Sequence, residues 1–442
     1  MSDIYLYINI AILIVICIIY LFLLINSRAP RLFFFYLMTF TLFIESHFIL
    51  SVTSSFSFGS SEWFFLGTFS DETRVTMIIM VTTYLLGLLW AMLTIAPCIN
   101  FSNRICWQRF YSFDTAKLIT FIILLISPLV VNYVISLLRF FSENGFYALY
   151  ESGDKISGGF ILDLLFLLLY TILICSKFKK LTSFLIIAFS LLYIILGMRL
   201  EFIFKVFPIV VYYILSLKDI NLLLTKKNIA ISSIIVILLV LGMQYSVALR
   251  DDASIENNFL YLFLQQQGVS INVLGLAIAN ENNALLSPLV VFSPIYDSVN
   301  ALLHTFTGET PYYQGNSVEF AKNSLSLSHK LSFIEDPKAY LSGYGVGGAS
   351  IAELYLAGGT IACLIGGMVT YYIISVLEIV ATKSKFTLLF VMIIFGKIIY
   401  SPRGEYFSFL SLDRMLLLFF LLYLFIYLLS FFSPSKLYGQ SR

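Results

Sequence analysis

Long apolar runs separated by short polar segments dominate this 442-residue chain. About 20 apolar residues are enough to cross the hydrocarbon core of a bilayer as an α-helix. We therefore predict eleven membrane helices, some of them short. They are residues 4–26, 32–54, 75–96, 118–138, 160–176, 181–197, 202–217, 229–249, 354–379, 386–400 and 415–432. The first run has no basic segment before it, so we expect a retained helix rather than a cleaved signal peptide.

Lysine and arginine residues cluster after every second predicted span. Six segments carry two or three of them each: 28–31, 104–117, 177–180, 218–227, 383–385 and 436–442. Basic residues near the ends of membrane helices favour the cytoplasmic side. We therefore expect these six segments in the cytoplasm, with the N-terminus outside and the C-terminus inside.

The composition excludes a soluble globular protein. Hydrophobic residues make up 60% of the chain and charged residues only 12%, about half the charged fraction of a typical soluble domain. The net charge of +2 gives no indication of a nucleic-acid partner. The five cysteines have no C-x-x-C spacing and no acidic cluster demands a metal, so neither metal nor cofactor is predicted. The expected fold class is all-α and polytopic.

One connection, residues 250–348, is far longer than the others and divides the chain into 1–249, 250–348 and 349–442. Loops of this length in compact folds are usually functional, and the charge pattern places this one outside. Within it, 259–279 is typical of an amphipathic helix interrupted by three glutamines, and 285–305 of a surface or re-entrant segment. A full crossing by 285–305 would reverse the later topology, against the charge pattern.

Three arginines occupy tight turns on the expected outer side: Arg199, Arg250 and Arg403. Charged residues at such positions are costly and tend to be functional. Each has an acidic residue one or two positions later, so an ion pair is one explanation. Binding a phosphate is the other, because the planar guanidinium group of arginine holds two oxygens at once.

Further ionisable residues fall within predicted spans, among them Lys205, Lys397, Glu45 and His47. Lys205 and Lys397 lie close enough to span ends for their amino groups to reach water, and we expect this snorkelling for both. Glu45 and His47 are two positions apart and do not share a helix face, so a zinc pair is not expected. We interpret them as polar contacts between helices.

The large loop and the start of the ninth span carry further candidate chemistry. Tyr312 and Tyr313 suit stacking on sugar rings, and they also suit a membrane interface. A glycine-rich run, 343–348, leads into the ninth span and could bring backbone N–H groups close to an anion. Glu353, at the start of that span, is a candidate catalytic carboxylate.

These features together resemble the Wzy-type oligosaccharide repeat-unit polymerases of O-antigen and capsule assembly. The layout of many spans with one large, late outer loop covers nearly the whole chain. The motifs are Gly197-x-Arg199, Thr310-Pro311-Tyr312-Tyr313 and Ser350-x-x-Glu353-x-Tyr355-x-x-Gly358. The resemblance implies a membrane fold similar to the GT-C enzymes and O-antigen ligases, with one partly helical periplasmic loop.

The resemblance also implies a reaction, glycosyl transfer at the periplasmic face of the bacterial inner membrane. The growing glycan on undecaprenyl diphosphate would be the donor, and one lipid-linked repeat unit the acceptor. The implied roles are diphosphate binding for Arg199, Arg250 and Arg403, general base for Glu353 or His329, and sugar binding for Tyr312, Tyr313 and Tyr355. Membrane lipid, a chain-length regulator and a flippase are the other expected partners; nucleic acid is not.

Two alternatives stay open at this point. An O-antigen ligase would carry Asn, Ser or Gln after the loop histidine, whereas Lys330 follows His329 and Gly343 lies later than the ligase motif would place it. A lipid-linked oligosaccharide flippase, which is not an enzyme, would place its charges midway through the spans. The candidate charges cluster instead at the outer ends of the spans.

Overall fold

The computed structural model describes residues 2–54, 56, 69–96, 98, 113–144, 159–176, 178–195, 199–217, 225, 259–307, 315–411 and 414–432. In these residues the secondary structure consists of α-helices with one π-helical and several 3-10 turns, and they contain no strand. The predicted all-α class is therefore confirmed. Seven helical segments in the described part are long and apolar enough to cross a membrane.

Ten of the eleven predicted spans coincide with helices, and the eighth, 229–249, lies outside the described residues. The second span is built from three consecutive pieces: α2 (Phe33–Phe40), η1 (Thr41–Glu45) and α3 (Ser46–Thr53). The other nine are α1 (Ser2–Ile25), α4 (Asp71–Ile95), α5 (Phe113–Asn144), α7 (Gly159–Cys175), α8 (Lys179–Ile195), α9 (Arg199–Ser216), α17 (Ser350–Ala381), α18 (Lys385–Tyr400) and α19 (Arg414–Phe432).

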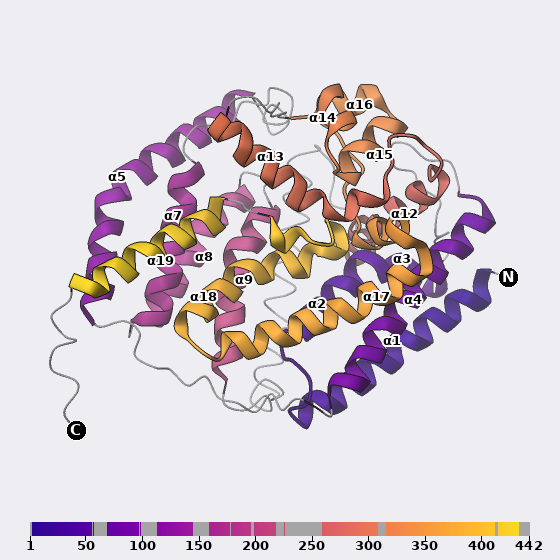
Figure 1. Cartoon of the computed structure of the whole chain (residues 1–442), viewed down its shortest axis with the longest axis horizontal. Helices are drawn as coiled ribbons and strands as arrows, with labels where there is room; N and C mark the ends of the chain where they lie inside the picture. The colour runs from indigo at the N-terminus through magenta and orange to yellow at the C-terminus, as the bar shows by residue number, and fades with distance from the viewer. Residues whose placement is uncertain are drawn as a thin grey trace.

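The helices form two packed groups. In one, α17 crosses α4, which also packs on α1; in the other, α5, α7, α8, α9 and α19 pack on one another (Figure 1). The helix α18 contacts α2, α9, α17 and α19 and so joins the two groups. Short helices of the long connection, α13 (Ser293–Thr307), α14 (Val318–Asn323), α15 (Leu327–Glu335) and α16 (Pro337–Leu341), lie along the upper edge of Figure 1.

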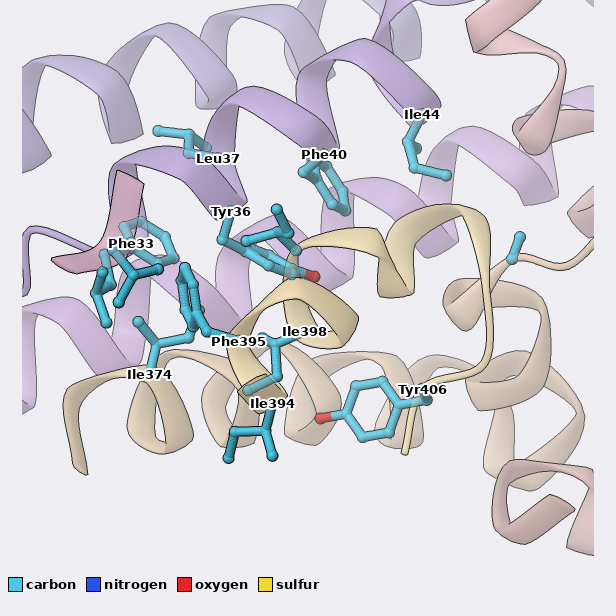
Figure 2. Packing of buried hydrophobic residues seen from close by; sticks show 14 of the residues in the cluster. Phe33, Tyr36, Leu37, Phe40, Ile44, Ile374, Ile394, Phe395, Ile398 and Tyr406 are labelled. Atoms are coloured by element: carbon cyan, nitrogen blue, oxygen red, sulfur yellow. The ribbon is translucent and has the colours of Figure 1, made fainter. Parts of the chain in front are cut away.

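The core between the groups follows from the apolar spacing of the second span. Phe33, Tyr36, Leu37, Phe40 and Ile44 recur every three or four residues, which places them on one face of a helix. Figure 2 shows this face of α2 and η1 opposite apolar side chains of α17 and α18. Burial of this stripe fixes the rotation of the second span.

Two glycines allow α4 and α17 to cross at close range. A Cβ on Gly87 would lie 2.1 Å from the carbonyl oxygen of Leu364, and one on Gly367 would lie 2.2 Å from that of Tyr84. Small residues let membrane helices approach closely enough for backbone packing. Both positions therefore require glycine for this crossing.

The π-helical turn η1 directs polar groups of the second span into the protein. The carboxylate of Glu45, fully buried, accepts a hydrogen bond of 2.7 Å from Asn9 on α1, and Asn9 accepts one of 2.9 Å from Thr82 on α4. His47 Nε2 lies 2.8 Å from the backbone oxygen of Gln265. The expected polar contacts between helices are confirmed for both residues.

The segment 259–279 differs from the expected single amphipathic helix. It forms two helices, α11 (Phe259–Gly268) and α12 (Ser270–Ala279), and most of α12 is buried against α4 and α17. A Cβ on Gly268 would lie 2.3 Å from Ser46 Oγ, so this glycine lets α11 approach α3 closely. By length and composition, 260–279 could cross a membrane. The pattern of polar residues did not predict this burial, because α12 is surrounded by protein on most sides.

The segment 285–305 forms η3 (Pro288–Phe292), which follows the extended residue Ser287 and continues directly into α13. Neither is among the described helices that are long enough to span, which agrees with the expected short segments. The helix α17 is itself broken. Gly358 and Gly359 leave helical geometry, and Gly359 has a φ of 58°, a left-handed conformation that suits glycine.

The expected snorkelling of Lys205 is wrong. Its side chain is 7% exposed, and its amino group lies 2.6 Å from Asp163 of α7 and 3.9 Å from Glu201. Lys397, half-buried, donates to the hydroxyl and the carbonyl oxygen of Ser411. Both ammonium groups therefore bind partners within the protein instead of water. The sequence pattern did not indicate these partners.

Candidate functional site

A tight turn after α18 carries Arg403 and forms the centre of the candidate site. The turn starts with η4 (Ser401–Arg403), in which Pro402 presets the backbone of the first turn. Arg403 Nη1 donates a hydrogen bond of 2.8 Å to Gln267 Oε1 on α11. Its guanidinium carbon lies 5.6 Å from the centre of the Phe43 ring on η1, within cation–π range. Arg403 is thus oriented from two sides and half-buried.

Glu353 joins the turn of Arg403 to α17 by a hydrogen bond. It lies in the first turn of the helix, is 1% exposed, and accepts a hydrogen bond of 2.8 Å from the backbone N–H of Tyr406. The hydroxyl of Tyr406 donates to the backbone oxygen of Gly366 at 2.7 Å. The backbone N–H and the hydroxyl of Tyr406 therefore both bind α17 and hold the turn 401–406 against it.

The glycine-rich run before α17 packs against the same turn. A Cβ on Gly348 would lie 3.4 Å from the backbone of Gly404, at the limit of ordinary contact. The backbone N–H of Val346 donates to Ser332 Oγ at 3.0 Å. The glycines of this run thus allow its backbone to pack closely against the turn.

A second carboxylate of the turn, Glu405, faces the long connection. It accepts hydrogen bonds from Ser293 Oγ at 3.1 Å and Ser326 Oγ at 3.2 Å. Burial raises the pKa of Glu405. Burial, and then the charge of Glu405, raise the pKa of Asp297 to about 6. Glu405 thus bonds to serines, and among the described residues no ion pair joins it to Arg403.

His329 belongs to a different cluster. Its Nδ1 lies 2.9 Å from the hydroxyl of Tyr340, and its ring packs on Phe320 with centres 4.2 Å apart. Burial lowers the pKa of His329 to about 4, so the imidazole is neutral at pH 7. No described hydrogen bond joins it to Glu353 or Arg403.

The other predicted site residues are only partly described. Arg199 is the first residue of α9, but its side chain lies outside the described part, as do Arg250, Tyr312 and Tyr313 altogether. The hydroxyl of Tyr355 donates to the carboxylate of Glu281. In the described structure Glu353 binds the backbone of the turn that carries Arg403, and the roles of all these site residues stay predictions.

Sequence reasoning did not identify two residues of this site. Gln267 orients Arg403, and the run of three glutamines in an apolar helix was the available signal. Asp297 lies near Glu405 across about a hundred residues of sequence, which no local pattern indicates. Among the described residues, no group of three His, Cys, Asp or Glu side chains could hold a metal ion.

Comparison with known proteins gives one match. No curated protein and no solved structure matches the chain. The model of the family described as O-antigen polysaccharide polymerase Wzy matches residues 2–434, nearly the whole chain. This match confirms the resemblance and lends no support to a ligase or a flippase. The chain therefore belongs to the O-antigen polysaccharide polymerase Wzy family, and it is a multi-pass inner-membrane protein that polymerises O-antigen repeat units.

Proposed function

We propose that the chain is a glycosyltransferase whose donor is the growing glycan on undecaprenyl diphosphate and whose acceptor is one lipid-linked repeat unit. A hydroxyl of the acceptor sugar attacks the anomeric carbon of the donor, and the lipid diphosphate leaves. The hydroxyl proton passes to a base of the protein. The N-terminus and the connection 250–348 are periplasmic in this proposal, and the C-terminus is cytoplasmic, as the distribution of basic residues indicates.

The observation that carries the proposal is that Glu353 binds the backbone of the turn 401–406, which also carries the oriented side chain of Arg403. The leaving diphosphate gains negative charge, and a preorganised guanidinium group stabilises that charge. We assign this role to Arg403, which Gln267 and Phe43 hold in one orientation. Arg199 and Arg250 are proposed for the same diphosphate.

We assign Glu353 as the general base for the acceptor hydroxyl. Its carboxylate lies beside the turn of Arg403, as a base next to the leaving-group site requires. In the described state the carboxylate is enclosed. The proposal therefore includes a movement of the turn 401–406 that opens a path from the acceptor to Glu353. The assignment of His329 as base has less support, since its ring belongs to a separate cluster with Tyr340 and Phe320.

A charge-conserving substitution tests the diphosphate role. Arg403→Lys keeps the positive charge but loses the planar pair of donors. With purified protein in vesicles and lipid-linked repeat units as substrate, we expect the polymerisation rate to fall about a hundredfold, as for loss of one preorganised donor. Arg74→Lys is the matched control, because Arg74 is a partly buried arginine of α4 that pairs with Asp71 at 3.8 Å and has no proposed role in the reaction. A wild-type rate for Arg403→Lys would contradict the role.

An experiment with a deletion strain distinguishes a polymerase from a ligase in cells. A strain lacking the gene should attach one repeat unit to lipid A-core and lose the polysaccharide ladder. Bare core with polymer on the lipid carrier would indicate a ligase instead. Expression of the Arg199→Ala variant at normal level should not restore the ladder.

A further inference from the structure

A pocket of about 360 Å³ lies beside the break in α17, on a part of the helix that the proposed reaction does not use. Pockets that bind small molecules have volumes from about 300 Å³ upwards. This one has room for a sugar residue. Its lining includes Glu281, Asn282, Ser287, Tyr355, Leu356 and Gly359.

The lining offers hydrogen-bond acceptors next to an aromatic ring. The carboxylate of Glu281 accepts a hydrogen bond from the hydroxyl of Tyr355, which orients both groups at the pocket. Asn282 adds an amide, and Ser287 a hydroxyl. A sugar ring presents hydroxyl donors at its edge and C–H groups on its faces, so carboxylate, amide and aromatic groups complement it.

The helix break opens the backbone to the pocket. A Cβ on Gly359 would meet no atom within 4 Å, so the space beside this residue is free. Backbone groups at an interrupted membrane helix are available to ligands, and half-helix ends of this kind form substrate sites in transporters. The carboxyl end of the first half, 350–357, also carries partial negative charge.

The pocket and the carboxylate of Glu353 flank the same two turns of α17. Tyr355 follows Glu353 by two residues, so their side chains leave the helix on different sides. Glu353 faces the turn of Arg403, whereas Tyr355 faces Glu281. A sugar in the pocket would therefore lie beside the reaction site without occupying it.

We propose that this pocket binds a non-reacting sugar residue of the lipid-linked glycan and so selects the repeat unit. The proposal rests on the proposed function. Among the described lining residues, Glu281 carries the one charge, so the pocket favours neutral or amino sugars over uronic acids, whose carboxylates it repels.

The test uses the purified full-length protein in vesicles, with the lipid-linked repeat unit from a strain that lacks the gene. Glu281→Gln removes the charge, and Asn282→Ala removes the amide at an exposed position where folding is not at risk. We expect each variant to need about tenfold more substrate for half-maximal rate, because Glu281→Gln weakens a charge-assisted hydrogen bond and Asn282→Ala removes one. The maximal rate should stay within about twofold of wild type, since the reacting groups are intact.

A second readout measures binding without the lipid. The soluble oligosaccharide released from the repeat unit should inhibit the wild-type enzyme competitively and the two variants about tenfold less. Glu319→Gln, at an exposed carboxylate outside the pocket, is the matched control and should behave as wild type.

Three outcomes would overturn the proposal while leaving the proposed function intact: unchanged substrate dependence in both variants, a fall in maximal rate alone, or equal inhibition of wild type and variants by the soluble oligosaccharide. Absence of polymer from the wild-type protein under all conditions would instead contradict the proposed function itself.

Discussion

The backbone N–H of Tyr406 donates a hydrogen bond of 2.8 Å to the carboxylate of Glu353, and this bond ties the turn of Arg403 to the first turn of α17. Glu353 therefore has two separable properties. Its shape and acceptor oxygen hold the turn, and its basicity is the property assigned to catalysis. Substitutions that retain one property and remove the other separate them.

Glu353→Gln keeps an acceptor oxygen for Tyr406 but cannot take up a proton at neutral pH. We expect a correctly folded protein whose maximal rate falls by about 10²- to 10⁴-fold, the usual contribution of a general base. Glu353→Ala should in addition lower the melting temperature, because the buried N–H of Tyr406 loses its partner. Rates of polymer formation and melting curves in detergent provide the two measurements. Full activity of Glu353→Gln would exclude the general-base role and leave Glu353 as a residue that positions the turn.

Alanine at either crossing glycine should destabilise the protein. Gly87→Ala and Gly367→Ala each place a Cβ about 2 Å from a backbone oxygen of the other helix, and overpacking of this kind costs about 1–3 kcal/mol. The melting temperature of the purified protein checks this. Gly396→Ala is the control, because its Cβ would approach nothing closer than 3.4 Å, and it should be neutral. Equal melting temperatures for all three variants would show that α4 and α17 can separate freely.

The ion pair between Lys205 and Asp163 should show strong coupling. Lys205→Met leaves the carboxylate of Asp163 without its partner at 2.6 Å, and removal of one member of a buried pair costs about 3–5 kcal/mol. The double variant Lys205→Met, Asp163→Leu should recover most of this loss, since the one carboxylate left without the lysine, Glu201, is 41% exposed and therefore solvated. Denaturation of the four proteins of this double-mutant cycle gives the coupling energy. Additive losses would mean that water reaches both side chains.

His329 should make the protein less stable on acidification. The ordinary pKa of histidine is about 6.5, and burial lowers the pKa of His329 to about 4 in the folded state. The unfolded chain then binds a proton that the folded chain does not, so this contribution is complete above pH 6.5 and is lost as the pH falls from 6.5 to 4.

His329→Asn removes this titration and keeps an amide near Tyr340. Between pH 7.5 and 5.5 the wild type should lose about 1 kcal/mol more stability than the variant. Asp297, with a pKa of about 6, contributes in the opposite sense over pH 4–6, so the difference between the two profiles isolates the histidine. Parallel profiles would show that the pKa of His329 is the same in the folded and unfolded chains.

The positions of the helices could be predicted from the sequence, because they depend on local composition. Apolar runs bounded by basic residues located ten helices, because spanning length and the positive-inside preference depend on residues close together in the chain. The π-helical turn at Thr41–Glu45 and the burial of α12 were not predicted. Both depend on which helix lies opposite, and periodicity in one segment does not carry that information.

The candidate site was predicted in part for the same reason. Glu353 and Arg403 stood out because a charge at the mouth of an apolar helix is unusual in itself. Gln267 and Asp297 are ordinary polar residues in a long polar connection, and only the packing of that connection on the turn 401–406 gives them a role. Lys205 was misjudged because its partner, Asp163, lies on another helix.

The glycine break in α17 indicates where the membrane would begin on this helix. An unbroken helix of 32 residues would measure about 48 Å, far more than the ~30 Å of hydrocarbon in a bilayer. The part after the break, 360–381, measures about 33 Å and matches the bilayer by itself. With this part in the hydrocarbon, as in the proposed topology, the residues before the break would stand in the headgroup layer. Glu353 would then be a carboxylate at the level of a lipid diphosphate, shielded by protein rather than by hydrocarbon.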